Sequence, residues 1–246
     1  MNHKLKDRKQ KIGLVLGGGG AKGAYQAGVL KALKEANILP YVTHVSANSI
    51  GSINALMVVD EKIEGCAEVW KTISKKDALK LKSKSEKGGI FSRKGLIKIL
   101  ENNIDFNHVS QSDKKLYITA FNKDTQKIEY FLANGKTKEE ILSYTLASSA
   151  IPYVYAPVKI GEHYYSDGFK DNVPVRVLKN AGCDVIIIIG LRPEYHPTPE
   201  ELEGISVIDF TPPYQLGTSR FDALDFKPAN IEFRLKNGYL TAKKIL

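Results

Sequence analysis

A serine lies at position 49, between two segments of different periodicity. Residues 42–46 predict a buried strand, and the small and apolar residues 50–59 predict a helix. A serine on such a strand-to-helix turn projects above the sheet at the positive end of a helix, where it can act as a nucleophile. The usual pattern is Gly-x-Ser-x-Gly; here Gly51 fills the last position and Ala47 replaces the first glycine. A helix N-cap is the alternative interpretation of Ser49.

Glycines at positions 17–20 precede Ala21-Lys22-Gly23. They lie between a predicted strand over residues 11–16 and a predicted helix over residues 21–36. Glycines at such a junction leave backbone N–H groups pointing outward at the positive end of a helix. That arrangement suits a phosphate or the oxyanion of an acyl transfer, and a tight turn without a ligand is the alternative. The candidate donors are Gly18, Gly19, Gly20 and Gly23, with Lys22 as a supporting residue of the motif.

The same glycines match Gly-x-Gly-x-x-Gly, so a Rossmann-type nucleotide-binding protein is an alternative. That fingerprint requires an acidic residue at the end of the second strand. The second predicted strand instead ends in Val45-Ser46-Ala47-Asn48. A Walker loop requires Ser or Thr after its lysine, and Lys22 is followed by Gly23. Both features disfavour a nucleotide.

A nucleophilic serine needs a base. None of the five histidines has the context of a late catalytic loop, so a Ser-His-Asp triad is not supported. The histidines are His3, His44, His108, His163 and His196. Asp167, in Tyr165-Ser166-Asp167-Gly168-Phe169, is the better candidate. An acid followed by glycine after a strand is also typical of a plain turn, which is the alternative here.

The net charge of +9 is unevenly distributed, with +4 in residues 1–12 and +8 in residues 71–98. Such blocks attract phosphates on nucleic acids or anionic bilayers, although a solvated face is the other interpretation. No aromatic residue lies among the lysines of residues 71–87, so nucleic-acid binding is the weaker option. The candidate membrane-surface residues are Lys80, Lys82, Lys84, Lys87, Ile90 and Phe91.

The remaining composition narrows the class of protein. The only two cysteines, Cys66 and Cys183, have no metal-ligand or disulfide spacing, which predicts a reducing compartment and no metal site. No signal peptide or membrane-spanning segment is recognisable, so we expect a cytoplasmic chain that at most lies on a membrane surface. The sequence predicts no cofactor and leaves the oligomeric state open.

The order of predicted elements is that of an α/β protein. A strand, glycine loop, helix, strand, turn and helix begin the chain, which is typical of a parallel sheet. A hairpin over residues 116–132, a helix over 137–148 with Thr137 as N-cap, and a strand over 185–189 follow. Further predicted elements are strands over 158–160, 163–165 and 205–210 and helices over 95–103, 174–180 and 238–246. We expect a basic arm over residues 1–10 and one domain over residues 11–246.

Taken together, these motifs resemble those of the patatin-like phospholipases. GGGGAKGAYQAGVLKAL resembles that family's oxyanion loop and first helix, VSANSIGSINAL its nucleophile elbow, and YYSDGFKDNVPV its Asp-Gly motif. The segment 147–152 and residues 237–239 are also similar to the family. The resemblance covers residues 11–246, and the three motifs occur in the expected order.

The resemblance implies a three-layer α/β/α sandwich with a mostly parallel central sheet. It also implies a serine lipid acyl hydrolase that uses a Ser49–Asp167 dyad and acts on acyl lipids or phospholipids. Two departures stand out: Ala47 replaces the family's glycine, and Phe169 replaces the small residue that follows Asp-Gly168. Because of these two departures, the alternative function is that of a weak or inactive family member that binds lipid or protein.

Overall fold

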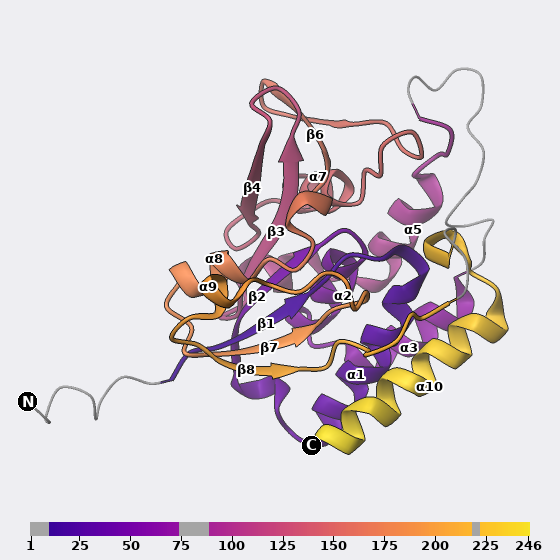
Figure 1. The fold of residues 1–246 in the computed structure, drawn as a ribbon. Helices are drawn as coiled ribbons and strands as arrows, with labels where there is room; N and C mark the ends of the chain where they lie inside the picture. The colour runs from indigo at the N-terminus through magenta and orange to yellow at the C-terminus, as the bar shows by residue number, and fades with distance from the viewer. Residues whose placement is uncertain (1–9, 74–88, 218–221) are drawn as a thin grey trace, which may run out of the picture.

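The computed structural model describes residues 10–73, 89–217 and 222–246 (Figure 1). Most of the predicted basic arm and the four membrane-surface lysines, Lys80, Lys82, Lys84 and Lys87, lie outside the described residues. The described elements, from the first strand to the last helix, are built around a single mixed sheet, which confirms the α/β class.

Five parallel strands form the centre of the sheet, in the order β3-β2-β1-β7-β8. They are β1 (Ile12–Leu16), β2 (Val42–Asn48), β3 (Lys115–Asn122), β7 (Val185–Ile189) and β8 (Ser206–Asp209). Because the strands are parallel, their carboxyl ends lie at one edge. The glycines that follow β1 and the serine that follows β2 are therefore brought side by side.

Three antiparallel strands extend the sheet beyond β3. They are β4 (Lys127–Leu132), β5 (Val158–Ile160) and β6 (His163–Asp167). The hairpin partner β4 pairs with β3 along six residue pairs, and β6 pairs with the last three residues of β3. In this register Asp167 lies opposite Ala120, beyond the carboxyl end of β2. The antiparallel extension thus brings the carboxylate to the edge that carries Ser49.

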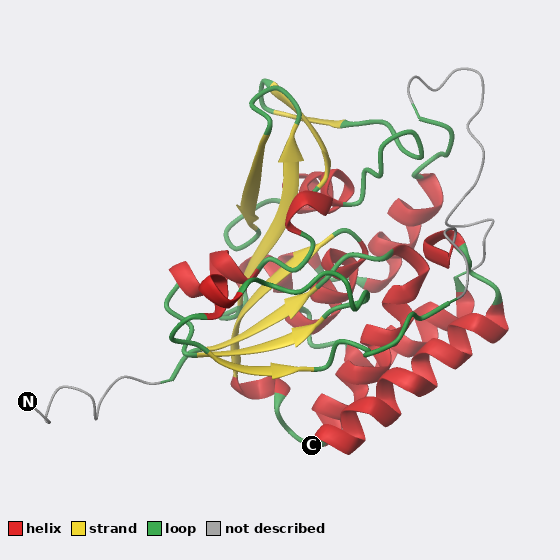
Figure 2. Cartoon of the chain, viewed as in Figure 1, coloured by secondary structure: helices red, strands yellow, loops and turns green. Residues whose placement is uncertain are grey.

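Helices cover both faces of the sheet, as the three-layer expectation requires. On β1, Leu14 and Leu16 point to the larger core and Val15 to the other, which is the two-residue period of a strand. The larger core includes α1 (Gly23–Glu35), α2 (Ile50–Val59) and α3 (Ile63–Thr72). On the opposite face, α8 (Val175–Asn180) packs through Val175 and Leu178 (Figure 2).

The last helix, α10 (Pro228–Ile245), runs alongside α1 at close backbone distance (Figure 1). A Cβ atom on Gly28 would lie 2.1 Å from the carbonyl oxygen of Leu235. One on Gly238 would lie 2.0 Å from the carbonyl oxygen of Tyr25. Glycine is therefore required on both helices, which accounts for Gly238 in a helix interior despite its low helix propensity.

The remaining helices connect these layers. They are α5 (Lys94–Asn103), α6 (Phe106–Gln111), α7 (Lys138–Ser148) and α9 (Pro199–Leu202), with short 3-10 turns at Gly20–Lys22, Leu39–Tyr41, Phe169–Asp171 and Asp222–Leu224. The predicted N-cap is confirmed, because the Thr137 side chain accepts from Glu140 N–H in a complete capping box.

Two predicted helices differ from the structure. The helix expected at residue 21 begins at Gly23, because Gly20–Lys22 forms a 3-10 turn that ends the glycine loop. The helix expected over 238–246 begins ten residues earlier, at Pro228. Its first half lacks a clear apolar period because Arg234 occupies a fully buried position. The guanidinium there donates to the carbonyl oxygens of Leu216 and Asp225.

Candidate active site

Ser49 lies on a sharp turn between β2 and α2, with φ 54° and ψ −125°. This positive φ is costly for a residue with a side chain, and such strain is found at functional sites. Gly51 makes the turn possible, since a Cβ atom there would lie 2.1 Å from the carbonyl oxygen of Leu16. Ala47, by contrast, is fully buried in the larger core, which accommodates its methyl group.

The backbone of the turn is held on both sides. Ser49 N–H donates to the Ser148 hydroxyl at the end of α7 (2.8 Å), and the Ser52 hydroxyl donates to the Ser49 carbonyl oxygen (2.6 Å). Ser49 occupies the N-cap position of α2, but its side chain makes no capping hydrogen bond to the helix. Its hydroxyl is thus available for chemistry at the positive end of the helix.

Asp167 ends β6 and is almost completely buried. Its N–H donates to the carbonyl oxygen of Ala150 (3.0 Å), which fixes the backbone. The Ser49 hydroxyl, the Asn48 side chain and the Phe169 N–H lie close enough to the carboxylate to lower its pKa. Burial nevertheless dominates and raises the pKa of Asp167 to about 6, because an apolar environment penalises the ionised form. A carboxyl with this pKa can take and return a proton near neutral pH.

Other bases are not positioned for this chemistry. Among the described residues that line the cavities around Ser49, none is a histidine. His44 lies in β2 beside Thr43, and burial lowers its pKa. His108 lies against Asp60, at the far end of α2 from Ser49.

The glycine loop places two unpaired N–H groups next to Ser49. Gly18 N–H donates to the carbonyl oxygen of Asn172 (3.2 Å), whereas within the described residues the N–H groups of Gly19 and Gly20 have no hydrogen-bond partner. Gly20 has φ 58°, and a Cβ atom there would lie 2.1 Å from the carbonyl oxygen of Ala223. Gly23 instead begins α1, and its N–H donates to the Gly20 carbonyl oxygen.

Asn172 is a site residue that the sequence interpretation missed. Its side chain donates to the carbonyl oxygen of Gly18 (3.2 Å) and accepts from the Asn48 side chain (3.2 Å). Asn172 therefore ties the glycine loop and the residue before Ser49 to the loop that follows Asp167. It lies five residues after that aspartate, inside the YYSDGFKDNVPV motif, and this position was the only available signal.

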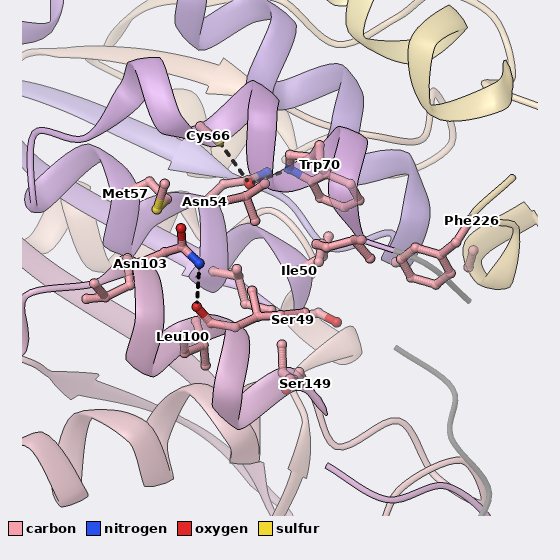
Figure 3. A pocket seen from close by; sticks show the side chains of 18 of the residues that line it. Ser49, Ile50, Asn54, Met57, Cys66, Trp70, Leu100, Asn103, Ser149 and Phe226 are labelled. Carbon is pink, nitrogen blue, oxygen red and sulfur yellow. Dashed lines mark hydrogen bonds between the residues drawn. The ribbon is translucent and has the colours of Figure 1, made fainter. Parts of the chain in front are cut away.

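Two cavities meet at Ser49. The first is apolar, with about 900 Å³ of empty space, its opening included. Figure 3 shows Ser49 and Ser149 on its wall, together with apolar side chains of α2, α3 and α5. Those side chains include Ile53, Met57, Val69, Trp70, Leu96 and Leu100.

One polar side chain in the wall of the apolar cavity is fully paired. Asn54 accepts from the Trp70 indole N–H (3.0 Å) and donates to the Gly23 carbonyl oxygen (3.0 Å) and the Gln26 side chain (2.9 Å) (Figure 3). Neighbouring Cys66 is completely buried, which raises the pKa of its thiol to about 12. Asn54 and Cys66 therefore present no unpaired amide and no reactive thiolate to this cavity.

The second cavity is more open, with about 790 Å³ of empty space. It lies on the glycine-loop side of Ser49 and is lined by Asp167, Phe169, Asn172, Arg192 and Tyr195, among others. Phe169 is 51% exposed at its rim. Ser49 and Gly20 belong to the walls of both cavities, so a bound molecule can extend in two directions from the hydroxyl.

The other predicted residues have mixed placements. Gly168 is required, because a Cβ atom there would lie 2.6 Å from Asn48 Oδ1. Lys22 is buried, and burial, followed by the charge of Arg192, lowers its pKa. Ile90 is exposed, whereas Phe91 packs against the larger core.

The described part of the chain holds no group of three or more His, Cys, Asp or Glu side chains arranged to bind a metal ion. None of its helices combines the length and the apolar character needed to cross a bilayer.

The fold and the strand–serine–helix turn beside a glycine loop define the class of protein, and comparison with known proteins identifies the family. The chain belongs to the patatin-like phospholipase family, whose model matches residues 14–179. It is similar to neuropathy target esterase sws of Drosophila melanogaster, with 31% identity over 184 residues and 72% of this chain covered. It is also similar to lysophospholipase NTE1 of Coccidioides immitis, with 28% identity and 77% of this chain covered.

A viral relative and a solved structure extend the comparison. Probable lipid hydrolase 463L of Invertebrate iridescent virus 6 is 29% identical over 184 residues, which cover 67% of this chain. The crystal structure of VipD from Legionella pneumophila matches 97% of this chain and 67% of that chain, with a TM-score of 0.55 and 14% identity, a likeness of fold. The chain spans 12% and 13% of the lengths of the fungal and fly relatives and 62% of the viral one.

Proposed function

We propose that the chain is a serine lipid acyl hydrolase that cleaves carboxylic esters through a Ser49–Asp167 dyad. The observation that carries the proposal is the placement of the Ser49 hydroxyl against the buried Asp167 carboxylate in the wall of one cavity. Beside them lie two loop N–H groups that have no hydrogen-bond partner among the described residues. The fungal, fly and viral relatives are named as lysophospholipase, esterase and lipid hydrolase, which supports the same reaction class.

The first half of the reaction acylates the serine. Asp167 accepts the Ser49 proton while the serine oxygen bonds to the ester carbonyl carbon. The N–H groups of Gly19 and Gly20 donate to the resulting oxyanion, and a donor of this kind is worth about 3 kcal/mol in the transition state. When the tetrahedral intermediate collapses, the ester C–O bond breaks and the leaving alcohol takes the proton from Asp167.

The second half regenerates the enzyme. Water enters through the second, more open cavity and loses a proton to Asp167 as its oxygen attacks the acyl carbonyl. Collapse releases the fatty acid, and the proton returns from Asp167 to the Ser49 oxygen. One carboxyl therefore acts in turn as base and acid, which a pKa near 6 permits at neutral pH.

The two cavities support an acyl lipid as substrate. The apolar cavity suits the acyl chain, because its wall consists almost entirely of aliphatic and aromatic side chains. The second, more open cavity suits the alcohol portion and the incoming water, because Asp167, Asn172 and Arg192 line it. Phospholipids and lysophospholipids are the members of this substrate class that the family description and the relatives' names favour.

The basic segment 71–98 favours an anionic membrane as a partner, to which the chain would bind peripherally. Exposed Ile90 is the described apolar residue at its edge that can enter the interface. We expect vesicle binding to rise with the anionic lipid fraction and to fall with salt. Equal binding to neutral vesicles in a flotation assay would count against this surface.

Ester hydrolysis by matched variants tests the proposed reaction. The wild type, Ser49→Ala and Asp167→Asn are compared on p-nitrophenyl esters of increasing acyl length, with exposed Lys236→Gln as the control. We expect both dyad variants to lose at least 1,000-fold in rate and the control to retain full activity. A wild type inactive on these esters and on phospholipid vesicles would favour a binding role, with Ala47 and Phe169 as the departures to revert.

A further inference from the structure

We propose that Arg192 forms a phosphate-binding subsite in the second cavity, so that the preferred substrate carries a phosphodiester headgroup on the alcohol side of the ester. This inference rests on the proposed function, because it assigns the headgroup that Ser49 chemistry alone leaves open. It concerns a residue outside the three motifs of the sequence.

The backbone places Arg192 beside the glycine loop. The strands β1 and β7 are parallel neighbours in the sheet. The segment that follows β7 therefore passes next to the loop that follows β1. Leu191 is completely buried, and a Cβ atom on Gly19 would lie 2.9 Å from its side chain. Gly190 N–H donates to the Thr211 hydroxyl (3.1 Å). The position of Arg192 is therefore fixed next to the N–H groups that face Ser49.

The Arg192 side chain is held in place but retains hydrogen-bonding capacity. Among the described residues that line the second cavity, it is the only lysine or arginine. Its guanidinium forms an ion pair with Glu194 (3.7 Å) and lies 5.6 Å from the centroid of the Tyr195 ring. Its side chain is 31% exposed. Because this ion pair is longer than a hydrogen bond, the guanidinium can still donate to a ligand in the cavity.

The two cavities indicate where the headgroup lies relative to Ser49. With the acyl chain in the apolar cavity and the ester carbon at Ser49, the alcohol portion extends into the second cavity. A phosphate a few bonds beyond the ester oxygen then meets the guanidinium. Arginine binds phosphate oxygens through two parallel N–H donors, which a neutral glycerol headgroup cannot match.

Two substrates with the same acyl chain test the subsite. The kcat/KM of a lysophosphatidylcholine and of the corresponding monoacylglycerol are measured below their micelle-forming concentrations. The variants are Arg192→Gln, Arg192→Lys and the charge-matched control Lys236→Gln on the exposed face of α10. We expect Arg192→Gln to lose at least 10-fold on the phosphodiester and less than 3-fold on the monoacylglycerol. Arg192→Lys should be intermediate, and the control should change neither rate by more than 2-fold.

Equal losses on both substrates, or no loss on either, would overturn the subsite while leaving the hydrolase assignment intact. Hydrolysis of neither substrate by the wild type would instead contradict the proposed function. A binding measurement tests the subsite independently of hydrolysis. In the Ser49→Ala background, Arg192→Gln should weaken the binding of lysophosphatidylcholine at least 10-fold, as measured by calorimetry. Unchanged binding in that background would also overturn the subsite. Circular dichroism verifies that each variant is folded.

Discussion

Replacing Asp167 with asparagine should stabilise the protein while abolishing its activity. Burial raises the pKa of Asp167 from its ordinary value of 3.8 to about 6. Because one pKa unit corresponds to about 1.4 kcal/mol, the ionised carboxylate costs the folded state about 3 kcal/mol at pH 7 or above. Asparagine keeps the shape and an acceptor for the Ser49 hydroxyl but carries no charge. The free energy of unfolding should therefore rise by up to about 3 kcal/mol.

The pH dependence gives this prediction its sign. A carboxyl whose folded pKa is raised binds its proton more tightly in the folded state, so the wild type loses stability as pH rises from about 3.8 to about 6. The Asp167→Asn variant lacks that loss. Its advantage should be full above pH 7, fall to roughly 1.5 kcal/mol at pH 5, and vanish below about pH 4.

Urea unfolding at pH 5, 6, 7 and 8 measures the difference in free energy directly. The exposed Asp113→Asn variant is the matched control, and its effect should stay within about 0.5 kcal/mol at every pH. Ser49→Ala should be inactive without acquiring the pH-dependent gain. An Asp167→Asn variant that is less stable than the wild type at pH 8, or whose gain does not depend on pH, would refute the assignment of a buried, destabilising carboxylate.

Three further predictions concern the reaction. The kcat/KM of the wild type should fall about tenfold per pH unit below an apparent pKa of about 6, because protonated Asp167 cannot act as a base; a flat profile from pH 5 to 8 would contradict this role. Gly19→Val should lower kcat at least about 100-fold on p-nitrophenyl esters with unchanged circular dichroism, because it crowds the oxyanion donors; retained turnover would remove the loop from the mechanism. Asn172→Ala should cost about 2 kcal/mol in urea unfolding and at least tenfold in kcat, because two hydrogen bonds that join the loops are lost; an unchanged kcat would make Asn172 purely structural.

The local chemistry of the site was predictable from the sequence because each motif follows a strand. Glycines after β1 and a serine after β2 must meet at one edge of a parallel sheet, wherever the rest of the chain lies. The role expected for Asp167 needed the resemblance as well, since Asp-Gly alone also describes a turn. Only the structure shows that the antiparallel pairing of β6 with β3 brings this carboxylate to Ser49.

Other parts of the site depend on contacts between distant residues, which periodicity does not encode. Asn172 reaches Gly18 across 154 positions of the chain, and Arg192 reaches the cavity because its strand pairs with β1. The apolar cavity requires α2, α3 and α5 to converge with Phe226. The early start of α10 was hidden for a similar reason, since buried Arg234 is paired only by the tertiary structure.

Covalent labelling of the serine tests the central claim most directly. The wild type, Ser49→Ala and Asp167→Asn are incubated with a fluorophosphonate, and the adduct is mapped by peptide mass spectrometry. We predict a single adduct on Ser49 in the wild type, none in Ser49→Ala and strongly slowed labelling in Asp167→Asn. An enzyme that hydrolyses esters while its adduct maps to another residue, or that labels equally fast without Asp167, would contradict the dyad.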